Sequence, residues 1–400
     1  MHAIDISAAF LQGEPLEREV FLKPPRDACP AGYVWKLYRC IYGLNDAPRS
    51  WYETVKKILL RLGAVVSSFD NCLFLWFVDG KLIGILVCHV DDFALAGTTQ
   101  FLVMIFEGLN VSLKVGSCAK DNFQYLGLQF QQLSGSISVH QSKYIDSIQP
   151  VVLHGDRLKD DSSDLRHDEL MSLKKLSGQM NWVVTQTRPD VSFDVCAMSN
   201  TGKNPKIKLI KEANRALRKM KNNGLSLHFL PLGDPKFIEV LAFSDATYAS
   251  LADGSSQGGY IVLLKGQNNV IAPVSWQSKK LNRVTKSPLA SEALAVNEAA
   301  DAGFLVSSML AEILNLVKLP VVHCFTDSKS LVENIASTKV VSDRRLRVDV
   351  ARLRQMIERS EVDLHWVEGS DQIADSLTKR GASFAKLFEV LTRSSLHVQY

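Results

Sequence analysis

The sequence lacks paired cysteines, long apolar runs and a strong excess of charge of either sign. Its seven cysteines lie scattered between positions 29 and 324 without a Cys-x-x-Cys, which argues against a disulfide framework or a zinc ribbon and favours a reducing compartment. The longest apolar stretch, 83–90, is interrupted by Gly84 and His89 and is too short to span a bilayer. No signal peptide precedes the first motif. We therefore expect a soluble, intracellular protein without a membrane partner.

Composition predicts a folded chain of several domains. The sequence has 400 residues, of which 46% are hydrophobic and 22% charged, as in ordinary globular proteins. At roughly 100–200 residues per domain, this length predicts two to four domains. The formal net charge is only +4. An argument for nucleic-acid binding must therefore rest on where the charges lie.

Two adjacent acids, Asp91 and Asp92, interrupt a strongly apolar stretch. Strand-forming runs on both sides, 81–90 and 93–97, predict a β-hairpin with the acids at its turn. Ionised carboxylates beside a core are costly unless they are paired or bind a cation, so the pair is a candidate metal site. Asp is also a common turn residue, and taken alone the pair fits a solvated turn better than a metal site.

Other motifs surround this hairpin in a fixed order. Asp5 lies in an apolar strand that leads into Phe10, the segment 42–52 leads into a helix with apolar residues at helical spacing, and Tyr125-Leu126-Gly127 follows the hairpin. Their order and spacing resemble the reverse transcriptase of copia-type LTR retrotransposons. Each motif alone is weakly specific, and the series of motifs carries the resemblance.

The resemblance implies a nucleotidyl-transfer site. Two Mg²⁺ ions, with Mn²⁺ as the alternative, would lie about 3.5–4 Å apart over the attacking hydroxyl and the leaving pyrophosphate. Asp5 and Asp91 would hold them, and Asp92, which regular strand geometry sends to the opposite face, would support them. By the same resemblance Phe10 would lie under the incoming sugar, although it also fits an ordinary core residue, and the turn with Tyr125 and Gly127 would hold the primer end.

Three features depart from the family pattern. His89 stands where an aromatic Tyr is usual, and Asn45-Asp46 replaces the usual Lys-Gln. The upstream fingers segment, which supplies basic residues for the triphosphate, is absent, and a domain that starts inside its first core strand looks N-terminally truncated. We therefore expect this chain alone not to polymerise.

A basic helix is predicted in the middle of the chain. An amphipathic helix at 170–184 precedes Thr187-Arg188-Pro189-Asp190, which matches a family motif. The cations of the next helix, opposed by Glu212 alone, are Lys203, Lys206, Lys208, Lys211, Arg215, Arg218, Lys219 and Lys221. Such a run can follow a phosphate backbone or form a solvated helix face. In a thumb-like position we favour the phosphate backbone, with Lys208, Lys211, Arg215 and Arg218 as the binding residues.

The last 165 residues predict a second catalytic domain. Three consecutive strands followed by alternating helices and strands give the order of an RNase H-like fold. Acids fall where that fold builds its site: Asp245 ending the first strand, Glu292 in the first helix, Asp327 ending the fourth strand and Asp375 in the last helix. The motifs around these acids again resemble copia-type elements. Four carboxylates from separate elements can bind two metal ions that activate a water against an RNA phosphodiester.

Several residues of this domain have competing interpretations. Glu298 is the other helix acid, but six residues at about 100° each place it on a different face from Glu292. His365 beside Trp366 fits a strand residue better than a metal ligand, and no loop histidine precedes the last helix. The arginines of the helix at 343–360 could contact a hybrid backbone or simply solvate the helix.

The predicted fold is an α+β reverse-transcriptase palm and thumb followed by an α/β RNase H-like domain with a mixed five-stranded sheet. We predict a palm with incomplete fingers at 1–150, a helical thumb or connection at 151–235, the RNase H-like domain at 236–382 and a tail at 383–400. The expected partners are RNA template, DNA primer, RNA/DNA hybrid, dNTPs and other Pol-derived chains. The expected location is the cytoplasm, including virus-like particles, with a nuclear phase as an option.

The predicted function is RNA-directed DNA synthesis combined with cleavage of RNA in hybrids, with RNase H as the activity that this chain retains by itself. Two alternatives stay open. One is a truncated, non-catalytic relic that binds nucleic acid. The other is a hybrid nuclease that uses the palm only as a platform.

Overall fold

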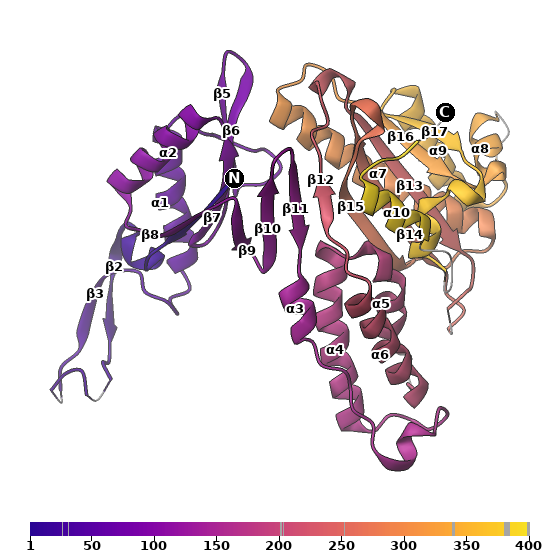
Figure 1. The fold of residues 1–400 in the computed structure, drawn as a ribbon, viewed down its shortest axis with the longest axis horizontal. Coiled ribbons are helices and arrows are strands. Elements are labelled where there is room, and N and C mark those ends of the chain that lie inside the picture. The colour runs from indigo at the N-terminus through magenta and orange to yellow at the C-terminus, as the bar shows by residue number, and fades with distance from the viewer. Residues whose placement is uncertain are drawn as a thin grey trace. The chain divides into compact units, whose positions relative to one another are not determined.

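The computed structural model describes residues 1–25, 27–30, 32–200, 202, 204–251, 253–337, 341–379 and 385–397 (Figure 1). The chain divides into two compact units. The first comprises Met1–Leu126 and Glu312–Asn315, and the second comprises Gly127–Ala311 and Leu316–Tyr400. Among the described residues, no helix is both long and apolar enough to cross a bilayer.

The first unit is built on a six-stranded antiparallel sheet. Its strand order is β4-β5-β6-β7-β1-β8. The strands are β1 (His2–Ile6), β4 (Val65–Val66), β5 (Leu73–Val78), β6 (Lys81–His89), β7 (Asp92–Gly97) and β8 (Val115–Lys120). The predicted acidic hairpin is therefore β6–β7, at the centre of the sheet next to β1. A separate hairpin of β2 (Pro15–Leu22) and β3 (Trp35–Arg39), and the short β9 (Asn122–Tyr125), complete the strands of this unit.

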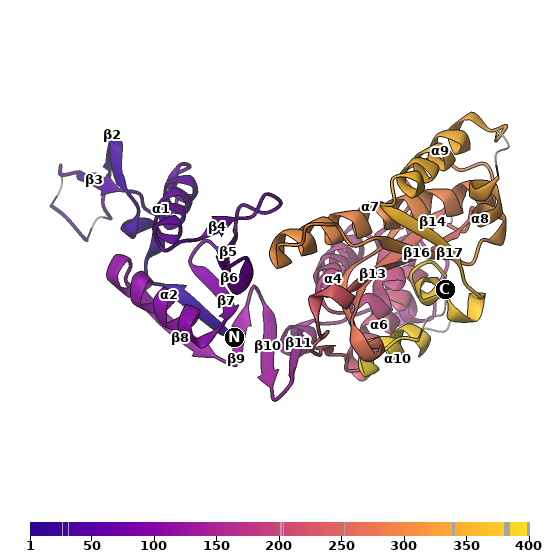
Figure 2. The same cartoon turned by 90° about the horizontal axis from the view of Figure 1, so that it is seen from above.

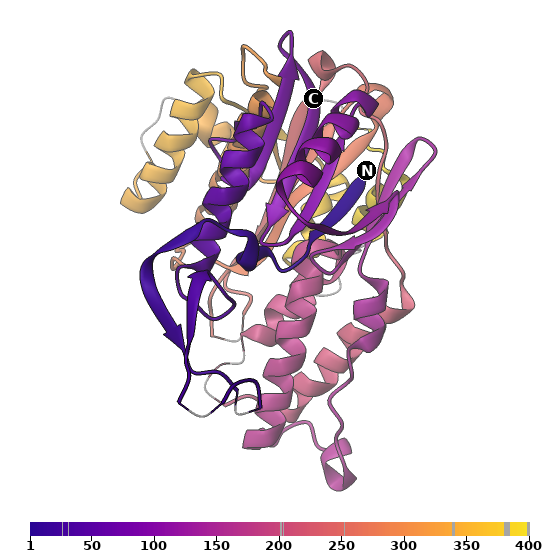
Figure 3. The same ribbon diagram turned by 90° about the vertical axis from the view of Figure 1, so that its left-hand side faces the viewer.

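Two helices, α1 (Ala47–Arg61) and α2 (Thr99–Ser112), share one hydrophobic core with this sheet. Figure 3 shows both helices in front of the strands. Helix α1 begins with Pro48 in its first turn, a position that needs no backbone N–H, and buries Trp51 and Val55. Helix α2 begins after Thr98, whose side chain accepts a hydrogen bond from the Phe101 amide at 3.2 Å.

The second unit opens with a small sheet and a helical region. Strands β10 (Leu128–Leu133), β11 (Ser136–His140) and β12 (Leu227–Phe229) pair in that order. The helices are α3 (Ser142–Ser147), α4 (His167–Gln186), α5 (Ser192–Ser199) and α6 (Ile207–Asn222). The amphipathic helix predicted at 170–184 is α4. Strand β12 falls in the stretch 151–235, for which the sequence predicts a helical thumb or connection, and it returns the chain to the small sheet before the last domain begins.

A buried ion pair holds the helical region together. Arg188 follows α4, is fully buried, and donates from Nε and Nη2 to Asp190 at 2.8 Å each. Its Nη1 donates to the carbonyl of Met220, near the end of α6, at 2.6 Å. The Thr-Arg-Pro-Asp motif thus ties α4 to α6 through a charge that is fully paired inside the core.

The last domain has a mixed five-stranded sheet in the order β15-β14-β13-β16-β17. Its strands are β13 (Glu239–Thr247), β14 (Gln257–Lys265), β15 (Ile271–Lys280), β16 (Val322–Thr326) and β17 (Val362–Trp366). The first three pair antiparallel, whereas β16 and β17 join β13 in parallel. This is the RNase H-like order that the sequence predicts, with β13 in the middle.

Helices cover both faces of this sheet. One face packs against α7 (Pro288–Leu314), α8 (Lys329–Ala336) and α9 (Arg344–Glu358), and the other against the short 3₁₀ helix η7 (Ile373–Leu377) and α10 (Ala385–Arg393). Figure 2 shows α9 and α10 on opposite sides of the strands. Successive residues of β13 therefore alternate between two cores, and the odd-numbered ones, up to Asp245, face η7.

Candidate active sites

Three acids converge beside the central strand of the RNase H-like sheet. Asp245 lies on β13 and is 1% exposed, Glu292 lies in the second turn of α7, and Asp327 directly follows β16. One carboxylate oxygen of each lies within 4.8 Å of the others. Helix α7 begins at Pro288, and the hydroxyl of the preceding Ser287 accepts a hydrogen bond from the Ala290 amide at 3.2 Å, which fixes the first turn of the helix that carries Glu292.

The fourth predicted acid, Asp375, is connected to the other acids through the side chain of Lys379. It lies in η7 rather than in an α-helix, so the expectation that it belongs to the last helix is wrong, because the chain there makes only a short 3₁₀ turn. Lys379 Nζ lies 2.7 Å from Asp375 Oδ1 and 3.3 Å from Asp245 Oδ1. Thr378 donates its hydroxyl to the other oxygen of Asp245. The lysine thus bridges the fourth acid to the first.

Lys379 is not among the site residues predicted from the sequence. The available signal was its spacing, since Lys379 follows Asp375 by four residues and such pairs meet within one turn. Glu298, the competing helix acid, forms an ion pair with Lys279 at 3.0 Å. Glu292 is therefore the acid of α7 that joins the cluster.

Burial raises the pKa of the three acids in this cluster. Burial, opposed by Lys379, raises the pKa of Asp245 to about 6. Burial, together with the nearby Asp245 and Asp327, raises the pKa of Glu292 to about 9. The pKa of Asp327 is also raised, chiefly by burial. Burial by itself would lower the pKa of Lys379, but the carboxylates around it raise that pKa instead.

The cluster fits a divalent cation. Glu292 Oε2 is buried and has no hydrogen-bond partner among the described residues, although the Ala246 amide donates to the same carboxyl group. Buried polar atoms in native proteins are normally satisfied, and an unpaired carboxylate oxygen facing two other acids lacks a positive partner. Hard cations such as Mg²⁺ take oxygen ligands of this kind.

In the first unit, the acidic hairpin lies beside Asp5. Asp5 of β1 pairs directly with Asp92 of β7, and the Ile6 amide donates to the Asp91 carbonyl at 2.9 Å. Val90 and Asp91 form the turn, with Val90 at a positive φ of 57°. Trp51 of α1 anchors the turn by donating its indole N–H to the Val90 carbonyl at 2.6 Å.

The observed pairing differs from the prediction that Asp92 lies on the face of the strand opposite to the metal-binding acids. Directly paired residues of antiparallel strands project on the same side of the sheet, so Asp92 stands beside Asp5 instead of on the opposite face. Burial, and then the charges of Asp91 and Asp5, raise the pKa of Asp92. Among the described residues, these three acids do not form a group in which one oxygen from each lies within 4.8 Å of the others. The assignment of Asp5 and Asp91 as metal ligands stays a prediction.

Aromatic residues line the approach to these acids. Phe10 is 8% exposed and packs against Tyr42, with ring centroids 4.6 Å apart. Burial, and then the charge of Asp91, raise the pKa of Tyr42, which places this phenol between Phe10 and the acidic turn. The sequence placed Tyr42 in the segment 42–52 without assigning it a role. Its position shortly before α1, the helix whose Trp51 holds the acidic turn, could have indicated one.

The predicted primer-holding turn is tightly built. Tyr125 is buried and directs its hydroxyl to the Val87 carbonyl at 3.5 Å. Leu126 and Gly127 both have positive φ, 48° and 75°, a conformation that a residue with a side chain adopts only at a cost. Gly127 is thus placed where its lack of a side chain matters for the backbone.

The departures from the family pattern have local explanations. Asp46 immediately precedes α1 and accepts three hydrogen bonds from Arg18 of β2, at 2.9, 3.0 and 3.0 Å. The acid that replaces an amide is therefore neutralised by a cation on the β2–β3 hairpin. His89 is exposed and pairs with Asp92 across β6 and β7.

The basic helix is α6, which begins at Ile207, so Lys206 precedes it, while Lys203 lies outside the described residues. Lys208 approaches Glu212 at 4.0 Å and Lys211 forms an ion pair with Asp161. Arg215 and Arg218 are exposed. Two of the four predicted phosphate-binding residues thus have acidic neighbours, and the arginines present their charges to solvent.

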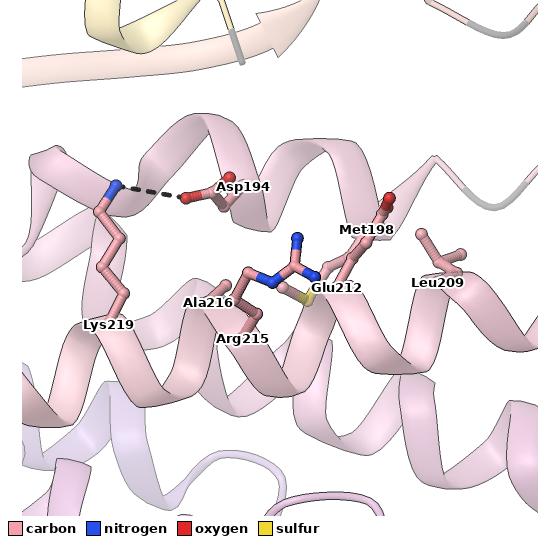
Figure 4. Close-up of a pocket in the computed structure, with 7 residues that line it drawn as sticks. All are labelled: Asp194, Met198, Leu209, Glu212, Arg215, Ala216 and Lys219. Atoms are coloured by element: carbon pink, nitrogen blue, oxygen red, sulfur yellow. Dashed lines mark hydrogen bonds and ion pairs between the residues drawn. The ribbon is translucent and has the colours of Figure 1, made fainter. Parts of the chain in front are cut away.

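Helices α5 and α6 enclose a small hollow of about 150 Å³ (Figure 4). Arg215 and Lys219 of α6 line it together with Asp194 and Met198 of α5. Lys219 lies 3.4 Å from Asp194. This ion pair uses part of the positive charge of α6 to join the two helices.

The arginines of α9 also serve the fold. Arg352 forms an ion pair with Asp301 and donates to Asn297 at 3.0 Å, both in α7. Arg354 donates to the carbonyls of Ile335 and Asn334 at 3.0 and 2.7 Å. These two arginines join α9 to α7 and α8, a role beyond the alternatives of hybrid contact and solvation.

Comparisons with known proteins agree with this architecture. Residues 1–154 match the family model of reverse transcriptase (RNA-dependent DNA polymerase). This segment is therefore similar to reverse transcriptases. Over 94% of its length the chain is 26% identical to the retrovirus-related Pol polyprotein from transposon RE1 of Arabidopsis thaliana, of which it covers 26%. It is also 26% identical over 94% of its length to the Pol polyprotein from transposon TNT 1-94 of Nicotiana tabacum, of which it covers 29%.

The resemblance to copia-type Pol polyproteins is thus confirmed, and the chain spans about a quarter of the length of these curated relatives. Among solved structures, a foamy viral protease-reverse transcriptase in complex with RNA/DNA hybrid is similar with a TM-score of 0.51 and 14% identity. That likeness covers 92% of this chain and 44% of the viral chain. The predicted fold class, a reverse transcriptase followed by an RNase H-like domain, is confirmed.

Proposed function

We propose that this reverse-transcriptase-family chain cleaves the RNA strand of RNA/DNA hybrids through its RNase H-like domain and supplies the palm acids for RNA-directed DNA synthesis. The observation that carries the proposal is the convergence of Asp245, Glu292 and Asp327, with their oxygens within 4.8 Å. An exposed glutamate would have a pKa near the ordinary value of 4.5, whereas burial raises the pKa of Glu292 to about 9. Buried, mutually repelling carboxylates of this kind are typical of functional sites.

The residues of the cluster would hold two Mg²⁺ ions. Bound there, the metal would supply an activated water and would stabilise the oxygen that leaves the phosphodiester. Glu292, whose pKa burial raises to about 9, would give up its proton to become an oxygen ligand beside Asp245 and Asp327. Lys379 would hold Asp245 and Asp375 apart from solvent until the substrate's phosphate arrives, and Thr378 would fix the rotamer of Asp245 through its hydroxyl.

The test is cleavage of a labelled RNA/DNA hybrid by the full chain with Mg²⁺, compared with Asp327→Asn. This change removes one carboxylate charge from the cluster at almost constant shape. Since metal-ion stabilisation of developing charge is worth several kcal/mol and each 1.36 kcal/mol is tenfold in rate, we expect a loss of roughly 10²–10³-fold. Glu298→Gln is the matched control, because that acid pairs with Lys279 outside the cluster.

A chain that folds and binds the hybrid but does not cleave it, with or without Mg²⁺, would contradict the proposal. The alternative, a non-catalytic nucleic-acid-binding relic, would then hold. One observation favours that alternative for the first unit: among the described residues, Asp5, Asp91 and Asp92 do not form a group in which one oxygen from each lies within 4.8 Å of the others. The non-catalytic alternative would be excluded for the first unit if the intact chain extends a DNA primer on an RNA template and Asp91→Asn does not.

A further inference from the structure

A second cluster of metal-binding side chains lies on the RNase H-like sheet, away from the acids. His323 of β16 pairs in register with Asp363 of β17, and His365 follows two residues later on the same strand. Residues at i and i+2 of a strand project from the same face, so the three side chains form a triangle on one surface. The buried neighbours Val322 and Cys324 belong to the core on the opposite face.

The distances in this triangle suit a transition-metal ion. His323 Nδ1 and His365 Nε2 lie 3.2 Å apart, and His323 Nδ1 lies 3.9 Å from Asp363 Oδ2. One donor atom of each residue lies within 4.8 Å of the others. Tetrahedral zinc with Zn–N bonds of about 2.0–2.1 Å requires ligand atoms about 3.3–3.4 Å apart, so the two nitrogens are already spaced for one ion and Asp363 needs a small rotation.

The environment orders the rings and leaves the site open. The His365 ring stacks on Phe325, with centroids 5.2 Å apart and an interplanar angle of 28°, and Phe325 is itself fully buried. The side chains of His323 and Asp363 are 18% and 50% exposed, so an ion can enter from solvent. Lys265, a cation near His323, is paired with Glu239 at 2.9 Å, which limits its repulsion of a bound metal.

We propose that His323, Asp363 and His365 bind one transition-metal ion of the zinc class, held between β16 and β17. Burial lowers the pKa of both histidines, which keeps the imidazoles in the neutral form that a metal requires. Three protein ligands leave the fourth position to water. The alternative explanation for the short distance between His323 Nδ1 and His365 Nε2 is a hydrogen bond through one proton shared by the two rings.

This site differs from the acid cluster in chemistry and place. Imidazole nitrogens select zinc-like ions, whereas oxygen-only sites suit Mg²⁺. His323 precedes Asp327 by four residues, about 13 Å of strand. A metal held by Asp363 and His365 would fasten β17, which among the described residues is an edge strand, to β16. The chain that leaves β17 leads to Asp375 and Lys379, so the ion would steady the path to the acid cluster.

The experiment titrates Zn²⁺ and, separately, Co²⁺ into the full chain with excess Mg²⁺ present to occupy the carboxylates. We expect one Zn²⁺ per chain by calorimetry and the intense visible absorption of tetrahedral Co²⁺. His323→Gln and His365→Gln should each weaken binding by more than about 100-fold, beyond the range for the loss of an outer-shell partner. His397→Gln, an exposed histidine, and Asp327→Asn should leave Zn²⁺ binding unchanged.

Loss of Zn²⁺ binding in Asp327→Asn with retention in both histidine variants would overturn the proposal, since the ion would then belong to the acids. A second measurement needs no variant: Zn²⁺ should protect His323 and His365 of the wild-type chain from diethyl pyrocarbonate, read by mass spectrometry. Equal modification of both rings with and without Zn²⁺ would equally refute the site, and the shared proton would be the remaining account of their contact.

Discussion

The buried acid Glu292 should make the metal-free protein less stable as the pH rises. The folded chain keeps the Glu292 proton up to a pKa of about 9, whereas the ordinary value is 4.5. Between these values the folded state binds one more proton than the unfolded state, so the free energy of unfolding falls with rising pH. Each pH unit corresponds to about 1.4 kcal/mol, and the loss from pH 4.5 to pH 7 is therefore about 3 kcal/mol.

Glu292→Gln removes this titration at nearly constant shape. In EDTA at pH 7 the variant should be more stable than the wild type by up to about 3 kcal/mol, which for a domain of 150–250 residues corresponds to a rise of roughly 6–12 °C in the thermal midpoint. The assay is the thermal midpoint of the full chain from pH 5 to pH 8. Saturating Mg²⁺ should raise the midpoint of the wild type, because a ligand of the folded state stabilises it, and should raise that of the variant much less.

Glu298→Gln, on the same helix and paired with Lys279 at the surface, should follow the pH dependence of the wild type. Parallel curves for the wild type and Glu292→Gln across this pH range would refute the reasoning. So would an equal response of the two proteins to Mg²⁺. Either result would mean that Glu292 is ionised and satisfied in the folded chain without a metal.

Three further perturbations test other parts of the structure. Lys379→Met removes the cation between Asp245 and Asp375, so we expect hybrid cleavage to reach half its maximum at a lower Mg²⁺ concentration, measured by Mg²⁺ titration. Gly116→Ala would place a Cβ 2.7 Å from Asp5 Oδ2, so in a chain with the fingers segment restored primer extension should fall while hybrid cleavage stays unchanged. Asp190→Asn leaves buried Arg188 without its counter-charge and should cost about 3–5 kcal/mol of stability by urea unfolding.

Each of these results has a clear opposite. An unchanged Mg²⁺ requirement in Lys379→Met would mean that the lysine does not compete with the metal. Equal losses of extension and cleavage in Gly116→Ala would indicate a global defect rather than displacement of Asp5. Retention of wild-type stability in Asp190→Asn would mean that solvent or another group satisfies Arg188.

The sequence was sufficient to predict those features that depend on the order of strands and helices along the chain. The alternation of strands and helices predicted the order of the RNase H-like sheet, and residue types at strand ends located Asp245 and Asp327. The six-residue separation of Glu292 and Glu298 predicted that only one would face the cluster, and the structure selects Glu292. These inferences needed only local periodicity and the known direction of parallel strands.

Other features depend on contacts between distant residues. The role of Lys379 and the burial of Glu292 require the fold itself, because neither residue carries a local signal of its environment. His365 looked like an ordinary strand residue because its partner His323 lies 42 positions away. The side of Asp92 could not be read from strand periodicity, since the turn at Val90 with positive φ resets the alternation before β7 begins.

The cation that bridges Asp245 and Asp375 comes late in synthesis. Asp245 lies on β13 and Lys379 follows η7, so 134 positions separate the two ends of this ion pair. A growing chain can form the β13–β14 hairpin long before the ribosome has added Lys379, and during that interval the acid at the sheet centre has no counter-charge. The early hairpin must therefore keep Asp245 hydrated or protonated. The nascent domain can bury this acid in its ionised form beside Lys379 only after residue 379 has been translated.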